Sequence, residues 1–291
     1  MKIFVWILLF LLVINVIAAL ITVFRKPRSI SSVLAWMMTL IFLPGIGFII
    51  YLFCGRGIDG QEVFKLSDDE KQMVQRIKEK VDVDNKKAGR DKRYDLLYDA
   101  KVLNRYFRNM DASPLAKRNS LQLFTDGQEK FQALFEDIRA AKETVHVEYY
   151  AFFNDTIGNQ FLDVLIEKLH EGVEVYLIYD PWGSPGANKK FFARYVDAGG
   201  KVAPFITSRD MIRKTRLNYH LHRKIVVIDG KIGWTGGFNV GDQYLNVTEK
   251  FGYWRDTHIR LVGTAVFSLQ EIFIMDWNAS VKYPEERMTY H

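Results

Sequence analysis

The sequence has one cysteine among its 291 residues, and this residue, Cys54, lies in an apolar stretch. A single cysteine excludes an internal disulfide and leaves the redox compartment open. The six histidines show no zinc-ligand spacing with each other or with Cys54. The sequence therefore predicts no metal site.

Acidic residues are absent from residues 1–56, which carry five basic side chains. The rest of the chain holds 35 basic and 34 acidic residues, so most of the net charge of +6 lies in the N-terminal segment. A near-neutral remainder argues against a polyanionic nucleic acid as the main ligand.

Two long apolar runs occupy residues 3–24 and 33–54. Each is long enough to cross a hydrocarbon core of about 30 Å, although Pro44 and Gly45 interrupt the second. We predict a two-helix transmembrane hairpin in residues 1–56, with a cleaved signal peptide or a buried helical hairpin as alternatives. The basic loop between the runs favours the cytoplasm, but later Lys/Arg-rich segments leave the orientation open.

Residues 57–114 are polar, and Ser67 and Glu70 have the spacing of a capping box at the start of a helix. We interpret them as a helical connector without chemistry. Strand-like and amphipathic segments then alternate, which predicts an α/β sandwich with a mixed sheet. The expected strands cover residues 119–127 (ending in a turn), 144–153, 173–180, 201–205, 221–237 (a hairpin) and 254–263, and the expected helices cover 128–142, 159–170, 189–198 and 266–277.

The hairpin begins with "LHRKIVVIDGK", in which His222 and Lys224 precede an apolar run and Asp229 begins the turn. Side chains alternate faces along a strand, so His222 and Lys224 point the same way, roughly 7 Å apart, whereas Asp229 has the opposite parity. A histidine nucleophile beside a lysine suits a phosphate group. The alternative is a strand-end pair that faces solvent.

The pattern H-x-K-x4-D, formed by His222, Lys224 and Asp229 and followed by "GGFN" at residues 236–239, resembles the signature of the phospholipase D superfamily. The string "HRKIVVIDGKIGWTGGFNVGDQYL" resembles bacterial cardiolipin synthases in particular. Three further segments resemble the same family in order: "VLAWMMTLIFLPGIGFIIYLFCGR", "HVEYYAFFNDTIG" and "FGYWRDTHIRLVG".

This resemblance implies a phospholipase D-like mixed-sheet α/β/α sandwich lobe over residues 115–291, after the anchor (1–56) and the connector (57–114). It implies a multi-pass enzyme of the bacterial cytoplasmic membrane that makes cardiolipin and glycerol from two phosphatidylglycerol molecules. His222, Lys224 and Asp229 are the implied catalytic residues, with His222 as the nucleophile and a phosphatidyl-histidine as the intermediate. Neither ATP nor any other cofactor is required.

The resemblance also implies a set of supporting residues. Asn239, together with the lysine, would hold the non-bridging phosphate oxygens. Gly236 and Gly237 would let the phosphate approach the backbone closely. A carboxylate would orient the histidine, and Asp256 is the first candidate, with Asp242 behind it.

Members of this family carry two copies of the signature in two lobes, whereas this sequence has one copy and no internal repeat. We therefore expect phosphatidylglycerol and membrane lipids as ligands, no nucleic acid, and a second catalytic lobe from another copy or a separate polypeptide. Two alternatives remain. One is a membrane-anchored single-motif phosphodiesterase or nuclease acting as a homodimer, and the other is a catalytically silent lipid-binding half.

Overall fold

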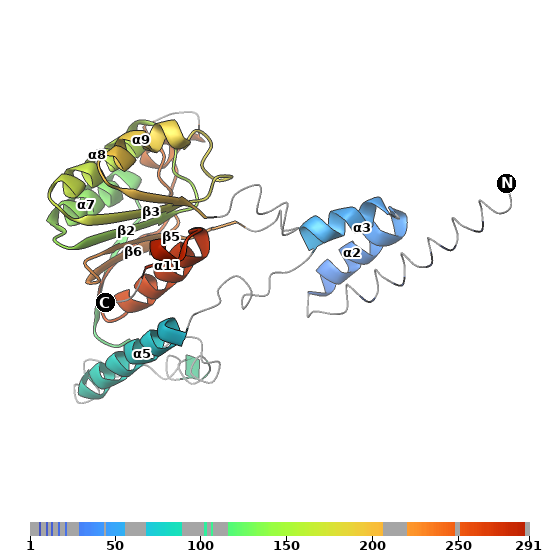
Figure 1. Cartoon of the computed structure of the whole chain (residues 1–291), viewed down its shortest axis with the longest axis horizontal. Coiled ribbons are helices and arrows are strands. Elements are labelled where there is room, and N and C mark those ends of the chain that lie inside the picture. Colours follow the sequence, from blue (N-terminus) through green and yellow to red (C-terminus); the bar gives the residue numbers. More distant parts are fainter. Residues whose placement is uncertain are drawn as a thin grey trace. The chain divides into compact units, whose positions relative to one another are not determined.

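A computed structural model describes residues 29–43, 45–55, 68–88, 116–205, 220–247 and 251–288, with isolated helical positions at 6, 10, 13, 17, 21, 102, 103 and 106. These residues form two units, one within residues 1–63 and the other within 64–205 and 220–291 (Figure 1). All of the predicted site residues lie in the second unit.

One seven-stranded mixed sheet forms the centre of the second unit, in the order β1-β7-β6-β5-β2-β3-β4. Strands β2, β3 and β4 are parallel neighbours, and the pairs on the β5 side of β2 are all antiparallel. The strands are β1 (Asn119–Phe124), β2 (Thr144–Tyr149), β3 (Glu174–Tyr179), β4 (Lys201–Pro204), β5 (Lys224–Ile228), β6 (Ile232–Gly236) and β7 (His258–Gly263).

Helices cover both faces of this sheet (Figure 1). One face carries α7 (Gly127–Ala140), α8 (Thr156–His170) and α9 (Lys189–Asp197), and the other carries α11 (Val266–Ser280). Along β5, Val226 and Ile228 pack in the core beneath α7, α8 and α9, whereas Ile225 and Val227 pack on the α11 side. This alternation confirms the predicted mixed-sheet sandwich. The predicted connector helix is also present as α5 (Asp68–Ala88).

The predicted hairpin begins at Lys224 rather than at residue 221, so His222 lies just before β5. Two further strands are shorter than expected, and side chains accept backbone hydrogen bonds where they stop. Strand β2 ends at Tyr149, after which the Ala151 N–H donates to Asn239 Oδ1 (3.1 Å) and the Phe152 N–H donates to Ser184 Oγ (2.9 Å). Residues 254–257 likewise precede β7, and the Thr257 N–H donates to the Asp256 carboxylate (2.7 Å). These two irregular segments supply part of the candidate site.

The first unit contains α2 (Ile30–Phe42), α3 (Ile46–Ile50) and a π-helical turn, η1 (Tyr51–Gly55). The second predicted span is therefore interrupted, as Pro44 and Gly45 indicated. Gly45 has a backbone φ of 82°, which residues other than glycine rarely adopt. Apart from five isolated positions, the first predicted span lies outside the described residues. Within the described part of the chain, no helix combines the length and apolar character needed to cross a bilayer.

Candidate active site

His222 and Lys224 come together at the start of β5. The His222 ring is exposed and packs against the Tyr150 ring, with centroids 4.8 Å apart. The Lys224 side chain is buried, lies 5.3 Å from the same ring centroid and donates to the His222 carbonyl oxygen (3.3 Å). The predicted juxtaposition of imidazole and ammonium is therefore present.

The pKa shifts of His222 and Lys224 favour a neutral imidazole beside a charged ammonium group. Burial, and then the charge of Lys224, lower the pKa of His222 below 6.5. Burial lowers the pKa of Lys224 to about 8, and the Asp256 carboxylate opposes that shift. Near neutral pH the imidazole is therefore mostly uncharged, while the lysine is mostly charged.

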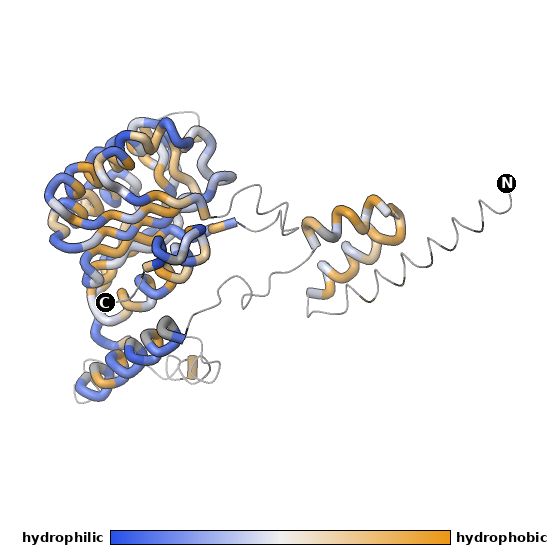
Figure 2. Tube along the Cα trace, in the orientation of Figure 1, coloured by the Kyte–Doolittle hydropathy of each residue, from blue (hydrophilic) through white to orange (hydrophobic). Residues whose placement is uncertain are grey.

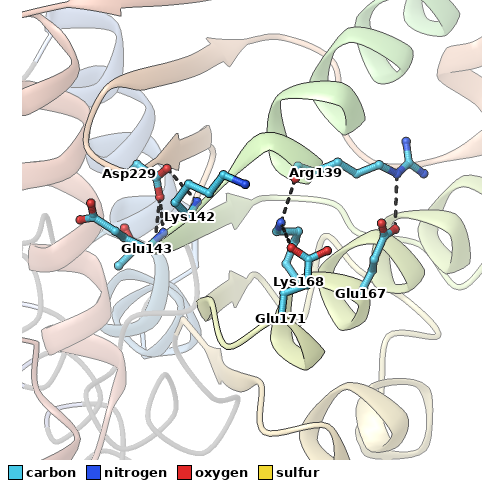
Figure 3. A network of polar contacts seen from close by, with 8 residues as sticks. Arg139, Lys142, Glu143, Glu167, Lys168, Glu171 and Asp229 are labelled. Atoms are coloured by element: carbon cyan, nitrogen blue, oxygen red, sulfur yellow. Dashed lines mark hydrogen bonds and ion pairs between the residues drawn. The ribbon is translucent and has the colours of Figure 1, made fainter.

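Asp229 lies at the other end of β5, in the turn to β6, as the parity argument predicted. Its carboxylate accepts hydrogen bonds from the backbone N–H groups of Lys142 (2.9 Å), Glu143 (2.8 Å) and Thr144 (2.9 Å), just before β2 (Figure 3). Although burial raises its pKa, these N–H groups lower the pKa of Asp229 below its ordinary value. The carboxylate joins two loops, and β5 separates it from His222.

Gly236 and Gly237 are pressed against the start of β7. A β-carbon on Gly236 would lie 2.4 Å from the Thr257 carbonyl oxygen and 2.7 Å from His258 Nδ1. A β-carbon on Gly237 would lie 1.9 Å from Asp256 Oδ1. The fold itself therefore requires Gly236, which meets backbone atoms, whereas a β-carbon on Gly237 would displace only the Asp256 side chain. Both glycines keep the role expected for them in phosphate approach. Among the described residues, no hydrogen bond joins Asp256 to the His222 ring.

Asn239 is buried and holds the segments around the site together. Its Oδ1 accepts the Ala151 N–H (3.1 Å), and its Nδ2 donates to the Tyr244 hydroxyl (2.8 Å). The amide nitrogen carries a second N–H, which remains available to a ligand oxygen.

Asp242, the second candidate for the carboxylate that orients the histidine, forms hydrogen bonds at the start of α8. Its carboxylate accepts the N–H groups of Thr156 (3.1 Å) and Ile157 (2.8 Å), and its own N–H donates to Asp155 (2.7 Å). These bonds satisfy backbone donors that a helix N-terminus leaves unpaired. The geometry therefore favours Asp256 over Asp242 as the carboxylate next to the catalytic pair.

Asp180, at the end of β3, is a site residue that the sequence analysis missed. One carboxylate oxygen accepts the Trp182 N–H (2.8 Å), and the other accepts the Leu221 N–H (2.8 Å) and lies 3.6 Å from His220 Nδ1. Asp180 thus anchors the residue immediately before His222. A polar residue directly after a buried strand was the available signal.

Two further basic groups lie buried on the same side of the sheet as Lys224. Lys130 of α7 donates to the Tyr149 hydroxyl (2.9 Å), and burial lowers its pKa well below the usual value. His258 is fully buried, and burial followed by the charges of Lys130 and Lys224 lowers its pKa. His258 pairs across the sheet with Gly236, so the interior below the glycines is rich in basic groups.

A pocket of about 470 Å³ opens beside the loops that follow β2 and β3. Phe153, Asp155, Asp242 and Phe251 are among its lining residues. Its walls are acidic and aromatic, in contrast to the basic side of the site around Lys224. Among the described residues, no group of three His, Cys, Asp or Glu side chains is placed to hold a metal ion.

An exposed histidine with a lowered pKa, a buried lysine and two closely packed glycines thus lie at one end of the mixed sheet, an arrangement that can bind a phosphate group. Residues 134–263 match the family model described as "Cardiolipin synthase, PLD-like domain", and residues 13–56 match "Phospholipase_D-nuclease N-terminal". The chain belongs to the phospholipase D superfamily, in the family of the cardiolipin synthases.

The curated relatives agree with this assignment. A cardiolipin synthase of Listeria monocytogenes is 42% identical over 286 residues, covering 94% of this chain and 57% of that protein. The major cardiolipin synthase of Bacillus subtilis is 41% identical over 268 residues, covering 91% of this chain and 55% of that protein. The chain thus spans a little over half the length of these relatives. Among solved structures, NucT from Helicobacter pylori aligns over 57% of this chain and all of its own, with 17% identity and a TM-score of 0.44.

Proposed function

We propose that this chain supplies one of the two catalytic lobes of a phosphatidyltransferase of the cardiolipin synthase type. The single observation that carries the proposal is the pair at the start of β5: an accessible His222 with a lowered pKa beside a buried cationic Lys224. The alignment with a cardiolipin synthase, at 42% identity over 94% of this chain, supports the choice of substrate class.

In the proposed first step, a ring nitrogen of His222 attacks the phosphorus of one phosphatidylglycerol. The bond from phosphorus to the glycerol oxygen breaks, and that oxygen leaves with a proton as glycerol. In the second step, a hydroxyl of another phosphatidylglycerol attacks the phosphatidyl-histidine, loses its proton to a base and restores His222. One phosphodiester replaces another, so the reaction needs no external energy source.

Lys224 and Asn239 are the proposed ligands of the non-bridging oxygens. Lys224 brings a charge that gains strength in a partly dehydrated site, and Asn239 has one N–H to donate beyond its bond to Tyr244. In the present geometry, the negative charge of Asp256 raises the pKa of Lys224. It is also the proposed carboxylate that orients the His222 ring, since catalytic hydrogen bonds are often long or poorly aligned before substrate binds.

The proposed reaction needs a second acid and base, because His222 cannot transfer protons while it holds the phosphoryl group. His220 lies near Asp180, and His258 is fully buried against Gly236. We assign neither of them to the leaving glycerol, because His220 faces the Asp180 carboxylate and His258 has no exposed surface. We therefore assign the second catalytic histidine to another polypeptide, either a second copy or a separate lobe.

We also propose that the first unit anchors the protein in a membrane. Large apolar side chains on α2 and α3 are exposed, including Ile30 (80%), Phe42 (72%) and Ile46 (63%). Figure 2 shows the same two helices as predominantly hydrophobic. Such a surface is stable where an apolar medium replaces water.

The test uses vesicles of phosphatidylglycerol and labelled lipid to follow cardiolipin and phosphohistidine. The monomeric chain in detergent should make no cardiolipin. Mixed with the part of the Listeria relative that this chain does not cover, the unmutated chain should form a phosphohistidine and recover transfer, whereas His222→Ala should do neither. Robust synthesis by the monomer would overturn the need for a second lobe. Absence of transfer and of phosphohistidine in every assembly, including a homodimer, would overturn the function.

A further inference from the structure

Arg223 lies between His222 and Lys224 in the chain but faces the opposite side of the sheet. It shares the parity of Ile225 and Val227, which pack on the α11 side. Its carbonyl oxygen accepts the Tyr150 N–H (3.0 Å), just beyond the end of β2. The residue that separates the two active side chains is thus fixed to β2 through its backbone.

The Arg223 side chain meets two buried acids. Its guanidinium is paired with the Asp276 carboxylate of α11, and its Nη1 lies 4.0 Å from Glu148 Oε1 of β2. The side chains of Glu148 and Asp276 are 0% and 1% exposed, whereas that of Arg223 is 42% exposed. Three elements, β2, β5 and α11, therefore converge on one guanidinium directly behind the catalytic pair.

One guanidinium cannot compensate two buried negative charges. Burial, and then the negative charge of Asp276, raise the pKa of Glu148 well above its usual value, and the charge of Arg223 opposes this only partly. Burial also raises the pKa of Asp276, but its direct ion pair with Arg223 opposes that shift. Glu148 lies farther from the guanidinium, and among the described residues neither of its carboxylate oxygens has a hydrogen bond, so burial favours its neutral form.

His222 itself precedes the β5 ladder, and among the described residues its ring has no hydrogen bond. The position of the His222 ring therefore depends on how the backbone of the residues before and after it is held. Leu221 on one side is held by Asp180, and Arg223 on the other is held by Asp276. Breaking the Arg223 contact would leave the buried Asp276 carboxylate without its charge partner, which is costly.

We propose that Arg223, Asp276 and Glu148 form a positioning group for the catalytic pair, in which the Arg223–Asp276 ion pair, with Glu148 of β2 beside it, fixes the backbone that carries His222 and Lys224. The inference rests on the proposed function for its kinetic consequence. Its structural consequence, the placement of the His222 ring beside Lys224, does not depend on turnover.

A matched pair of acid-to-amide substitutions tests the assignment. Glu148→Gln reproduces the neutral acid in shape and should leave kcat within about threefold of the parent. Asp276→Asn removes the charge partner of Arg223 and should lower kcat at least tenfold, with a smaller change in KM. The assay uses the assembly that is active with the unmutated chain. Arg223→Lys, which keeps the charge but not the planar fork, should give an intermediate kcat.

A second measurement separates positioning from folding and from the proposed function. NMR titration of the His222 ring needs no turnover and can be run on each folded variant below its thermal midpoint. In Asp276→Asn, or in Arg223→Lys if that variant is the better folded, the pKa of His222 should rise toward its ordinary value as the ring leaves Lys224. In Glu148→Gln it should not change.

Two results would overturn the proposal. One is an unchanged His222 titration in both Asp276→Asn and Arg223→Lys, because the ring position would then be independent of the ion pair. The other is a Glu148→Gln variant as impaired as Asp276→Asn at equal thermal stability, because Glu148 would then carry a charge. Failure of the proposed function would instead leave the titration result intact and show no transfer even in the parent assembly.

Discussion

Gly237 and Asp256 lie so close that a β-carbon on Gly237 would be 1.9 Å from the Asp256 carboxylate. The two residues belong to the turn after β6 and the segment before β7. Because the charge of Asp256 also raises the pKa of Lys224, the glycine sets how closely this carboxylate can approach Lys224.

Gly237→Ala should therefore displace the Asp256 carboxylate, which can turn away because it is the end of a flexible side chain. The stability should fall by about 1 kcal/mol, the low end for overpacking, and activity should fall at least tenfold. The control is the double variant Gly237→Ala/Asp256→Ala, in which the clash is absent, and which should recover the thermal midpoint but not the activity. A Gly237→Ala protein with parental stability and turnover would contradict the close approach.

His222→Ala should abolish phosphatidyl transfer in whatever assembly is active, because no other described residue is placed as the nucleophile. Loss of a nucleophile lowers kcat by many powers of ten. His170→Ala, the same substitution at the exposed C-terminal end of α8, serves as the control and should retain full activity. Turnover within about tenfold of the parent would remove His222 from this role.

Asp229→Asn should damage stability more than catalysis. Asparagine tolerates the observed φ of 50°, but its single oxygen cannot accept all three N–H bonds, at a cost of about 1 kcal/mol for this partly exposed group. Turnover of the folded protein should stay within about threefold. If the thermal midpoint is unchanged but turnover falls as far as in His222→Ala, Asp229 has a catalytic role.

The stability difference between the parent and Asp229→Asn should depend on pH. The pKa of Asp229 in the folded protein is lowered from its ordinary value of 3.8. The stabilisation by the charged carboxylate is therefore complete above about pH 4 and is lost as the pH falls through the lowered folded-state pKa. Thermal midpoints of both proteins, measured across this range, should converge at the acid end, and a constant difference would argue against a charged Asp229.

Activity should have a bell-shaped dependence on pH. It should rise as the pH increases through the lowered pKa of His222, which must be neutral to attack, and fall as the pH passes about 8, where Lys224 loses its proton. In Lys224→Arg, the residual activity should lack the alkaline limb, because a guanidinium does not titrate there. An alkaline limb that persists near pH 8 in this variant would assign it to another group.

The local order of residues was sufficient to predict several features of the site. The alternation of β-branched and amphipathic segments indicated the mixed sandwich, and strand parity placed His222 beside Lys224 and Asp229 away from them. These features depend on residues within one strand and its turn, where backbone geometry alone determines which side chains share a face.

Other contacts were decided only by the tertiary structure. Asp180 and Leu221 are 41 positions apart, Arg223 and Asp276 are 53 apart, and Asp242 and Thr156 are 86 apart. No periodicity in the sequence relates such residues, because their approach depends on strand order, on helix placement and on which buried charges find a partner. The sequence by itself determined that His222 and Lys224 lie together, and the packing of β2, β3, β7 and α11 around β5 decided which carboxylates and glycines surround them.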